Sequence, residues 1–229
     1  MQKDNNIKLI ISDIDGTLLE YITLKELVTE AITFFGISPK EEYLQMQING
    51  VIEALDEAAK EVIFGFDRLC YYWQKHFTFL NSYGLKVEDI ASKMLELEVK
   101  YSYPILHVKE TLMSLRDDYY KMVCSTNWLL SSQIAKLKAL ELDSYFDRIY
   151  SCEELIAKPN VKHFEDILES ENVTPHQAVM IGDSYTDMAA SEIGIKTILL
   201  DPDNSKQKLY QFSSHVITDL SEIPSLIKK

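Results

Sequence analysis

Cysteine, glycine and positive charge are all scarce in this 229-residue sequence, which has three cysteines and seven glycines. The cysteines (Cys70, Cys124 and Cys152) are far apart in apolar surroundings. This spacing argues against a disulfide framework or a cysteine metal site and predicts buried free thiols. Lys and Arg total 23 against 36 Asp and Glu, a formal net charge of −13. Such a surface repels nucleic acid and anionic membranes, so we expect neither as a partner.

Long hydrophobic runs are also missing, as are internal repeats, low-complexity tracts and obvious linkers. No run approaches the length of a transmembrane helix, and the polar residues 1–6 carry no targeting segment. We therefore expect a cytoplasmic protein, either monomeric or dimeric. The chain is long enough for one good core and an inserted second domain.

Helical spacing of apolar residues begins soon after residue 18. Thr23 and Glu26 fit a capping box at the start of a first helix, and Pro39 fits the first position of a second. An aromatic-rich helix should follow, ending near Gly84, and a fourth should run from about Val87. We therefore predict that residues 19–102 form an all-helical insert.

Strands and helices alternate in the rest of the chain. Strands are predicted over 8–11, 120–126, 148–152, 178–181 and 197–200, with an edge strand at 216–218. Helices are predicted between them, over 105–118, 130–140, 160–171 and 184–193. This alternation indicates an α/β fold with a mostly parallel sheet flanked by helices, built from residues 1–18 and 103–229.

Two carboxylates end the first predicted strand. Asp13 and Asp15 are two positions apart, so they would share one face of an extended strand and repel each other. Gly16, followed by Thr17, allows a sharp turn directly after them. The carboxyl ends of strands are where open α/β sheets bind ligands. A polar turn is the simpler alternative when these residues are considered alone.

Three more groups of polar residues follow predicted strands. Thr126 and Asn127 offer a hydroxyl and an amide that suit a phosphoryl oxygen, although a polar strand end is usually only a turn. Lys158 precedes a proline that can open a helix, although alone it would be a solvated surface charge. Asp183 and Asp187 follow a strongly apolar strand, where a helix cap is the simpler alternative.

Taken together, these motifs place four carboxylates at one edge of the sheet: Asp13, Asp15, Asp183 and Asp187. Four acids do not converge without a cation. An oxygen-rich and incompletely filled set of ligands suits Mg²⁺, which we therefore expect as the cofactor.

The four motifs resemble those of the haloacid dehalogenase superfamily, in its phosphatase branch. They occur in the family's order: Asp13-x-Asp15-Gly16-Thr17, Thr126-Asn127, Lys158-Pro159 and Gly182-Asp183-x-x-x-Asp187. The resemblance covers the chain outside 19–102. It implies a Rossmann-like core, a helical cap inserted after the first motif, and Mg²⁺-dependent phosphohydrolase activity through an aspartyl phosphate.

The resemblance also implies a role for each matched residue. Asp13 would be the nucleophile and a metal ligand. Asp15 would be the general acid/base and would bind the metal through its backbone carbonyl. The other implied roles are phosphoryl binding by Thr126 and Asn127, charge stabilisation by Lys158, metal ligation by Asp183, and support of the site by Asp187, Gly16 and Thr17.

Two features of the sequence depart from the family pattern. The lysine motif lacks the second proline often seen, and Ala157 stands where a glycine is usual. The family's dehalogenases lack an acid at the position of Asp15, so dehalogenation is not expected.

The expected substrate is a small phosphate ester, with nucleoside monophosphates and sugar phosphates as candidates. A phosphomutase resembling β-phosphoglucomutase, and a non-catalytic phosphate-ester-binding regulator, are the alternatives. Eight aromatic residues between Phe64 and Tyr83 could stack a nucleobase, but helical spacing more often indicates a bundle core.

Overall fold

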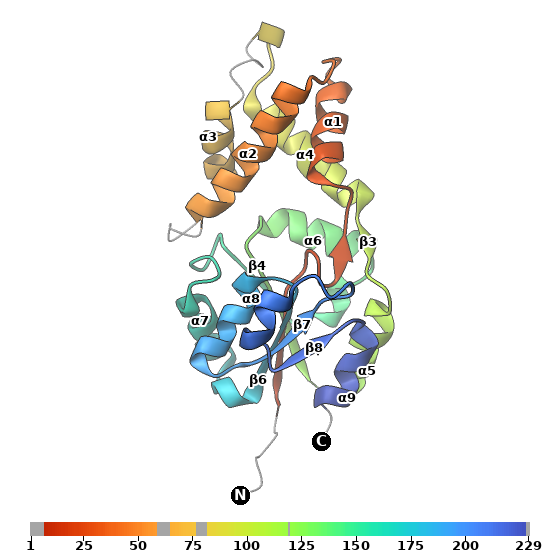
Figure 1. The fold of residues 1–229 in the computed structure, drawn as a ribbon, viewed down its shortest axis with the longest axis vertical. Helices are drawn as coiled ribbons and strands as arrows, with labels where there is room; N and C mark the ends of the chain where they lie inside the picture. The colour runs from red at the N-terminus through yellow and green to blue at the C-terminus, as the bar shows by residue number, and fades with distance from the viewer. Residues whose placement is uncertain (1–6, 59–64, 77–81, 119, 228–229) are drawn as a thin grey trace, which may run out of the picture.

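The computed structural model describes residues 7–58, 65–76, 82–118 and 120–227. Its core is a six-stranded sheet in which every neighbouring pair of strands is parallel (Figure 1). The strand order is β5 (Arg148–Ser151), β4 (Lys121–Thr126), β1 (Leu9–Ser12), β6 (Ala178–Gly182), β7 (Lys196–Leu200) and β8 (His215–Ile217). The predicted α/β fold with a Rossmann-like sheet is confirmed.

Helices cover both faces of this sheet. Alternate residues of β1 point to opposite faces, so Ile10 packs in one cluster and Leu9 and Ile11 in another. The first cluster includes residues of α5 (Val108–Asp117), α6 (Leu130–Ala139) and α9 (Ile223–Ile227). The second includes residues of α7 (Val161–Glu171). Because both faces of the sheet are buried, the inner strands have continuous apolar sequences instead of alternating ones.

The segment between β1 and β4 contains the insert. Its helices are α1 (Leu24–Phe34), α2 (Glu41–Ala58), α3 (Phe66–His76) and α4 (Val87–Tyr101). They stand beyond the sheet in Figure 1 and share a hydrophobic cluster that also includes Leu129, Cys152 and Ala157 from outside the insert. The chain leaves the core at β2 (Leu19–Glu20) and returns at β3 (Tyr103–Pro104), and these short strands pair antiparallel.

The sequence signals for helix starts were confirmed for α1 but not for α2. The capping box of α1 is present, because Thr23 N donates to Glu26 Oε2 (2.9 Å) and Glu26 N donates to Thr23 Oγ1 (3.3 Å). Pro39, by contrast, precedes α2, which begins at Glu41. The predicted helix over 184–193 is divided into α8 (Tyr185–Met188) and a 3₁₀ segment, Ala189–Ile193.

The aromatic residues of the insert have varied environments. Trp73 is fully buried, whereas Tyr71 and Tyr83 are exposed. Phe64, Phe77 and Phe79 lie outside the described residues. All three cysteines are buried free thiols, as predicted.

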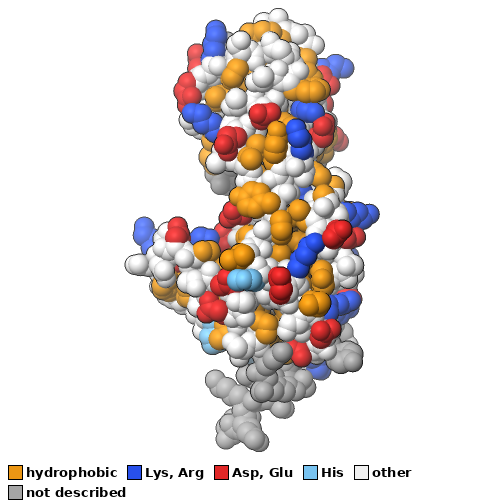
Figure 2. All heavy atoms as spheres, turned by 90° about the vertical axis from the view of Figure 1, so that its right-hand side faces the viewer, with side chains coloured by type: hydrophobic (Ala, Val, Ile, Leu, Met, Phe, Trp, Pro, Cys, Tyr) orange, Lys and Arg blue, Asp and Glu red, His pale blue; other side chains and the backbone are white. Residues whose placement is uncertain are grey.

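Two lobes joined by a narrower waist are visible from the side, with acidic and basic side chains interspersed over both (Figure 2). Within the described part of the chain, no helix has the length and apolar character needed to cross a membrane. We keep the division into a core (1–18 and 103–229) and a cap (19–102) as a proposal.

Candidate active site

The turn after β1 brings the first motif to the carboxyl edge of the sheet. Asp13 N continues the sheet ladder by donating to Ile181 O at 2.9 Å. Gly16 then adopts φ +79°, which only glycine reaches without strain. A Cβ at this position would also lie 2.8 Å from Asp183 Oδ2. The glycine is therefore needed both for the turn and for the close approach of the fourth motif to the first.

Lys158 is the central cation of the site. Its Nζ donates to Asp13 Oδ1 (2.9 Å), Asp187 Oδ1 (2.6 Å) and Ser125 O (2.9 Å). The residue is only 1 % exposed, so it is not the solvated surface charge of the simpler interpretation. Burial alone would lower the pKa of Lys158, but the carboxylates of Asp13 and Asp187 outweigh it and raise that pKa. The side chain is therefore a fixed positive charge.

The end of β4 holds the lysine loop in place. Asn127 Nδ2 donates to Lys158 O (2.7 Å), and Lys158 N donates to Asn127 Oδ1 (2.8 Å). Thr126 Oγ1 accepts from Trp128 N (3.1 Å) and from Gln133 Nε2 (2.9 Å). In this structure Asn127 thus orients the main chain of Lys158 rather than extending freely into the site.

Three of the four predicted carboxylates lie together. Oxygens of Asp13, Asp183 and Asp187 are all within 4.8 Å of one another. Burial, with the neighbouring Asp187, raises the pKa of Asp13 well above its usual range. Burial likewise raises the pKa of Asp183, although Lys206 Nζ donates to its Oδ2 at 2.8 Å. Burial and mutual repulsion make the charged forms of these clustered acids unfavourable. A divalent cation that takes oxygen ligands would offset this, so the cluster is suited to bind one.

Asp187 is less available than Asp13 and Asp183. Its Oδ1 accepts from Lys158, and its Oδ2 accepts from Ser184 N (3.2 Å) and Ser184 Oγ (2.7 Å). A supporting position beside the metal site therefore suits it better than a direct ligand position. Thr17, which follows Gly16 in the first motif, is fully buried, with no hydrogen-bond partner for its Oγ1 among the described residues.

The side chain of Asp15 turns away from the acidic cluster, toward α6. Gln133 Nε2 donates to Asp15 Oδ2 (2.5 Å), and Lys136 Nζ donates to Asp15 Oδ1 (2.6 Å). Both partners are fully buried, and sequence reasoning missed them. No local pattern pointed to them, because the buried residues of α6 are mostly polar: Ser132, Gln133, Lys136 and Leu137.

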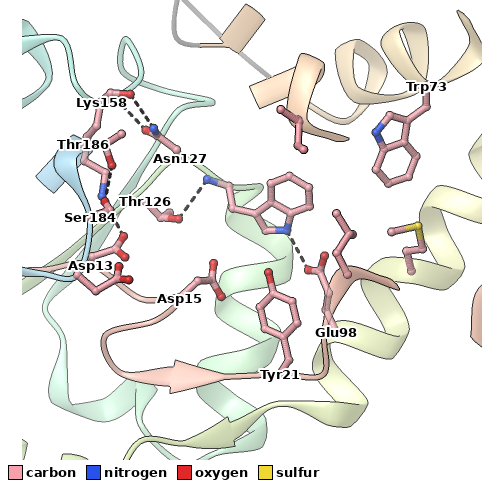
Figure 3. A pocket seen from close by; sticks show the side chains of 15 residues that line it. Asp13, Asp15, Tyr21, Trp73, Glu98, Thr126, Asn127, Lys158, Ser184 and Thr186 are labelled. Carbon is pink, nitrogen blue, oxygen red and sulfur yellow. Dashed lines mark hydrogen bonds and ion pairs between the residues drawn. The ribbon is translucent and has the colours of Figure 1, made fainter. Parts of the chain in front are cut away.

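A cavity of about 360 Å³ adjoins these residues, between the core and the cap helices. Figure 3 shows Asp13, Lys158 and Ser184 at one end and Trp73 at the other. The apolar and aromatic residues that line the cavity are Tyr21, Leu24, Ile52, Trp73, Met94 and Trp128.

Glu98, from cap helix α4, lines the same cavity and was also missed from the sequence. It is 3 % exposed, and its Oε2 accepts from Trp128 Nε1 (2.9 Å) and Ser132 Oγ (3.1 Å). Burial raises its pKa to about 7, even though Lys136 lies 3.8 Å away and acts in the opposite direction. A buried acid on α4 therefore accepts hydrogen bonds directly from Trp128 and Ser132 at the wall of the cavity.

Comparison with known proteins identifies the family. The sequence matches the model of the haloacid dehalogenase-like hydrolase family over residues 10–200. The chain belongs to this family. The resemblance drawn from the four motifs is thus confirmed.

Individual relatives match along nearly the whole chain. The sequence is 24 % identical to a glyceraldehyde 3-phosphate phosphatase of Pyrococcus furiosus, covering 97 % of this chain and 94 % of the relative. It is 26 % identical to a phosphoglycolate phosphatase of Nitrosospira multiformis, covering 97 % and 96 %. Both relatives are phosphatases, in agreement with the enzyme class that the motifs predicted.

A solved structure supports the fold. The HAD-hydrolase YfnB of Bacillus subtilis, bound to magnesium, aligns with a TM-score of 0.76 at 18 % identity. The alignment covers 97 % of this chain and 99 % of YfnB. The overall fold is therefore shared along nearly the full length of the two chains.

Proposed function

We propose that this protein is an Mg²⁺-dependent phosphohydrolase that cleaves small phosphate monoesters through a phosphorylated Asp13. One observation carries the proposal. The Asp13 carboxylate lies at the cavity, hydrogen-bonded to a buried lysine and beside two further acids, Asp183 and Asp187. This arrangement supplies a nucleophile, a fixed positive charge and a cation site around one point.

Asp13 is suited to covalent catalysis. Lys158 contacts its Oδ1, and among the described residues no hydrogen bond is made to its Oδ2. Oδ2 is therefore the oxygen that attacks phosphorus, forming a P–O bond while the bond to the ester oxygen breaks. A carboxylate nucleophile divides one difficult displacement into two easier ones. Lys158 opposes the effect of burial and favours the charged, nucleophilic form of Asp13.

Phosphoryl transfer depends mainly on positioning and on stabilisation of the negative charge on the transferred oxygens. Lys158, held by Asn127, provides part of that stabilisation. The hydroxyl of Thr126 lines the cavity and can contact the phosphoryl group. Mg²⁺, held by Asp13 and Asp183 and by the Asp15 backbone carbonyl, would supply further positive charge.

Asp15 is the proposed general acid and base. In the first step it protonates the departing ester oxygen. In the second step it accepts a proton from the water that attacks the phosphorylated Asp13, which releases phosphate. Gln133 and Lys136 hold its carboxylate in the structure, so a rotation of the side chain toward Asp13 is part of the proposal.

The decisive experiment combines a substrate panel with the Asp13→Asn variant. Wild-type protein with Mg²⁺ should hydrolyse p-nitrophenyl phosphate and several alkyl phosphates, and acid quenching should trap phosphate on Asp13. The nearly isosteric Asp13→Asn should fold normally and lose turnover by at least about 10³-fold, because the covalent route is closed.

Two results would contradict this proposal. Substantial activity of Asp13→Asn, with contamination excluded, would remove the covalent mechanism. Conversion of a sugar 1-phosphate to its 6-phosphate without release of inorganic phosphate would identify a mutase instead.

A further inference from the structure

The end of the cavity that faces away from Asp13 is mostly apolar, and the charged groups that line the cavity are mainly acidic. Apolar and aromatic side chains make up most of its wall, with Tyr21, Trp73, Met94 and Trp128 among them. Across the whole cavity, the described lining residues include four carboxylates (Asp13, Asp15, Glu98 and Asp183) and a single cation, Lys158. An organic group bound there meets aromatic surface and acidic oxygens.

Neither of the two nearby lysines is available to pair with a negatively charged organic group of a substrate. Lys158 Nζ already contacts two carboxylates and a backbone carbonyl at the phosphoryl end. Lys136 is fully buried and donates to Asp15, and it is not among the residues that line the cavity. Among the described residues that line the cavity, no cationic side chain is therefore left for a second anion on the substrate.

Glu98 disfavours anions at the apolar end, because the cation beside it, Lys136, lies 3.8 Å from its Oε2 and is shared with Asp15. Both of its described hydrogen bonds, from Trp128 and Ser132, end on Oε2. Its Oε1 keeps its capacity to accept a hydrogen bond. Because the pKa of Glu98 is raised to about 7, a second buried negative charge would either force Glu98 to take up a proton or meet its charge with little water to screen it. An N–H, O–H or ammonium group of a substrate would instead gain an acceptor.

We propose that this cavity selects phosphate monoesters whose organic group is uncharged or cationic and partly apolar, and that Glu98 excludes organic groups bearing a carboxylate or second phosphate. This inference rests on the proposed phosphohydrolase function and extends it to the substrate class. It separates the protein from its Nitrosospira multiformis relative, which is named a phosphoglycolate phosphatase. Specificity of this kind comes from a repulsive group as well as from attractive contacts.

The test compares esters that differ mainly in the charge of the organic group. Propyl phosphate, benzyl phosphate, phosphoethanolamine and 2-phosphoglycolate would be assayed for kcat/KM with Mg²⁺. We expect 2-phosphoglycolate to be at least about ten-fold poorer than propyl phosphate, and benzyl phosphate to be the best of the four, since like charges in a partly desolvated site are strongly disfavoured.

The Glu98→Gln variant isolates the charge, because Gln keeps an oxygen that can accept from Trp128 and Ser132. It should raise kcat/KM for 2-phosphoglycolate about ten-fold relative to propyl phosphate and lower it for phosphoethanolamine. Glu96→Gln is the matched control, since Glu96 is exposed on the same helix and pairs with Lys93. That control should leave the ranking of the four esters unchanged.

Binding to Asp13→Asn, measured by calorimetry, separates this inference from the proposed function. Binding needs no turnover, so a preference for uncharged and cationic esters there supports the inference even if hydrolysis fails. A wild-type enzyme that prefers 2-phosphoglycolate would overturn it while leaving the phosphatase proposal intact. A ranking that Glu98→Gln does not alter would also overturn it.

Discussion

Individual side chains of this site are held by partners that are buried with them. Lys158 is nearly inaccessible, and a buried ammonium is tolerated only when it is paired and hydrogen-bonded. Asp13 and Asp187 supply that pairing, and Ser125 O completes it. The same contacts that keep the lysine charged aim it at the proposed nucleophile.

The proposed acid/base role of Asp15 can be tested through the leaving group. Asp15→Asn should slow phosphorylation of Asp13 by alkyl phosphates by about 10²–10⁴-fold, because an alkoxide needs a proton as it departs. With p-nitrophenyl phosphate the same step should be slowed much less, since that leaving group barely needs protonation. Rapid-quench measurements of the two substrates provide the comparison. An equal loss for both would show that Asp15 only shapes the turn.

Short elements decide how closely the motifs approach one another. The turn after β1 and the start of α8 come from segments about 170 residues apart, and they meet only because β1 and β6 are neighbours in the sheet. Gly16 and Gly182 stand at this contact, where a Cβ on either would collide with an aspartate.

Gly16→Ala should disrupt the metal site. The added Cβ would lie 2.8 Å from Asp183 Oδ2, and the backbone there has φ +79°. We expect Mg²⁺ affinity, measured by calorimetry, to fall at least about ten-fold, the loss typical when the support of a metal ligand is disturbed. Gly36→Ala is the control, because φ is +75° there but nothing lies within 4 Å of the new Cβ. Equal loss of affinity in both variants would mean that backbone strain alone is responsible.

His163 joins α7 to its neighbours and should make stability depend on pH. Its Nε2 lies 2.8 Å from Ser125 Oγ and its Nδ1 lies 2.8 Å from Ile156 O. Burial, together with Lys158, lowers the pKa of His163 to about 4. The unfolded chain therefore binds a proton near pH 6.5 that the folded protein does not. Stability should be full above that pH and should decrease as the pH falls toward 4.

The contribution of His163 should reach about 3 kcal/mol, following from the size of this pKa difference. Urea unfolding between pH 4 and 7.5 would measure it in the wild type and in His163→Gln, where this part of the pH dependence should disappear. His176→Gln, at an exposed position, is the control. A pH dependence that persists unchanged in His163→Gln would assign the effect to other groups.

Over the whole molecule, the excess of negative charge makes a bound cation important. The net charge is −13, and Asp13 and Asp183 meet at the site with raised pKa values. We therefore expect EDTA to abolish hydrolysis and Mg²⁺ to restore it. Ca²⁺ should restore it poorly, because its larger and looser coordination suits this site less well.

Thermal unfolding gives a readout of metal binding that does not depend on activity. Mg²⁺ should raise the melting temperature of the wild type, because a ligand that binds only the folded state stabilises it. Asp183→Asn should lose most of that increase, whereas Asp203→Asn, at an exposed position, should keep it. Full activity in EDTA, or no Mg²⁺ effect on the wild-type melting temperature, would remove the metal from the mechanism.

At the scale of the whole molecule, the cavity is lined by residues of both the proposed core and the proposed cap. Trp128 and Ser132 belong to the core, and Glu98 belongs to a cap helix, so their hydrogen bonds bridge the two parts. Loop or lid closure over a site excludes water and completes it. We therefore expect the substrate preference to depend on both parts together.

The sequence by itself determined which residues would meet. Parallel strands place their carboxyl ends along one edge, so acids, hydroxyls and a lysine that follow successive strands are predictable neighbours. Periodicity likewise indicated the helices and strands, and the Thr23 capping box is a local pattern. Asp13, Asp183 and Asp187 accordingly lie together, as their positions after β1 and β6 predicted.

Only the tertiary structure decided how these residues are arranged and what surrounds them. Asp15 is held by Gln133 and Lys136, more than 110 positions away, and Glu98 reaches the cavity from another helix. Contacts over such separations follow from how helices pack onto a sheet, and no local periodicity records them. The polar residues concerned occupy helix positions that read as ordinary solvated sites. They become functional candidates because packing removes water from them and leaves each with a specific charged or hydrogen-bonding neighbour.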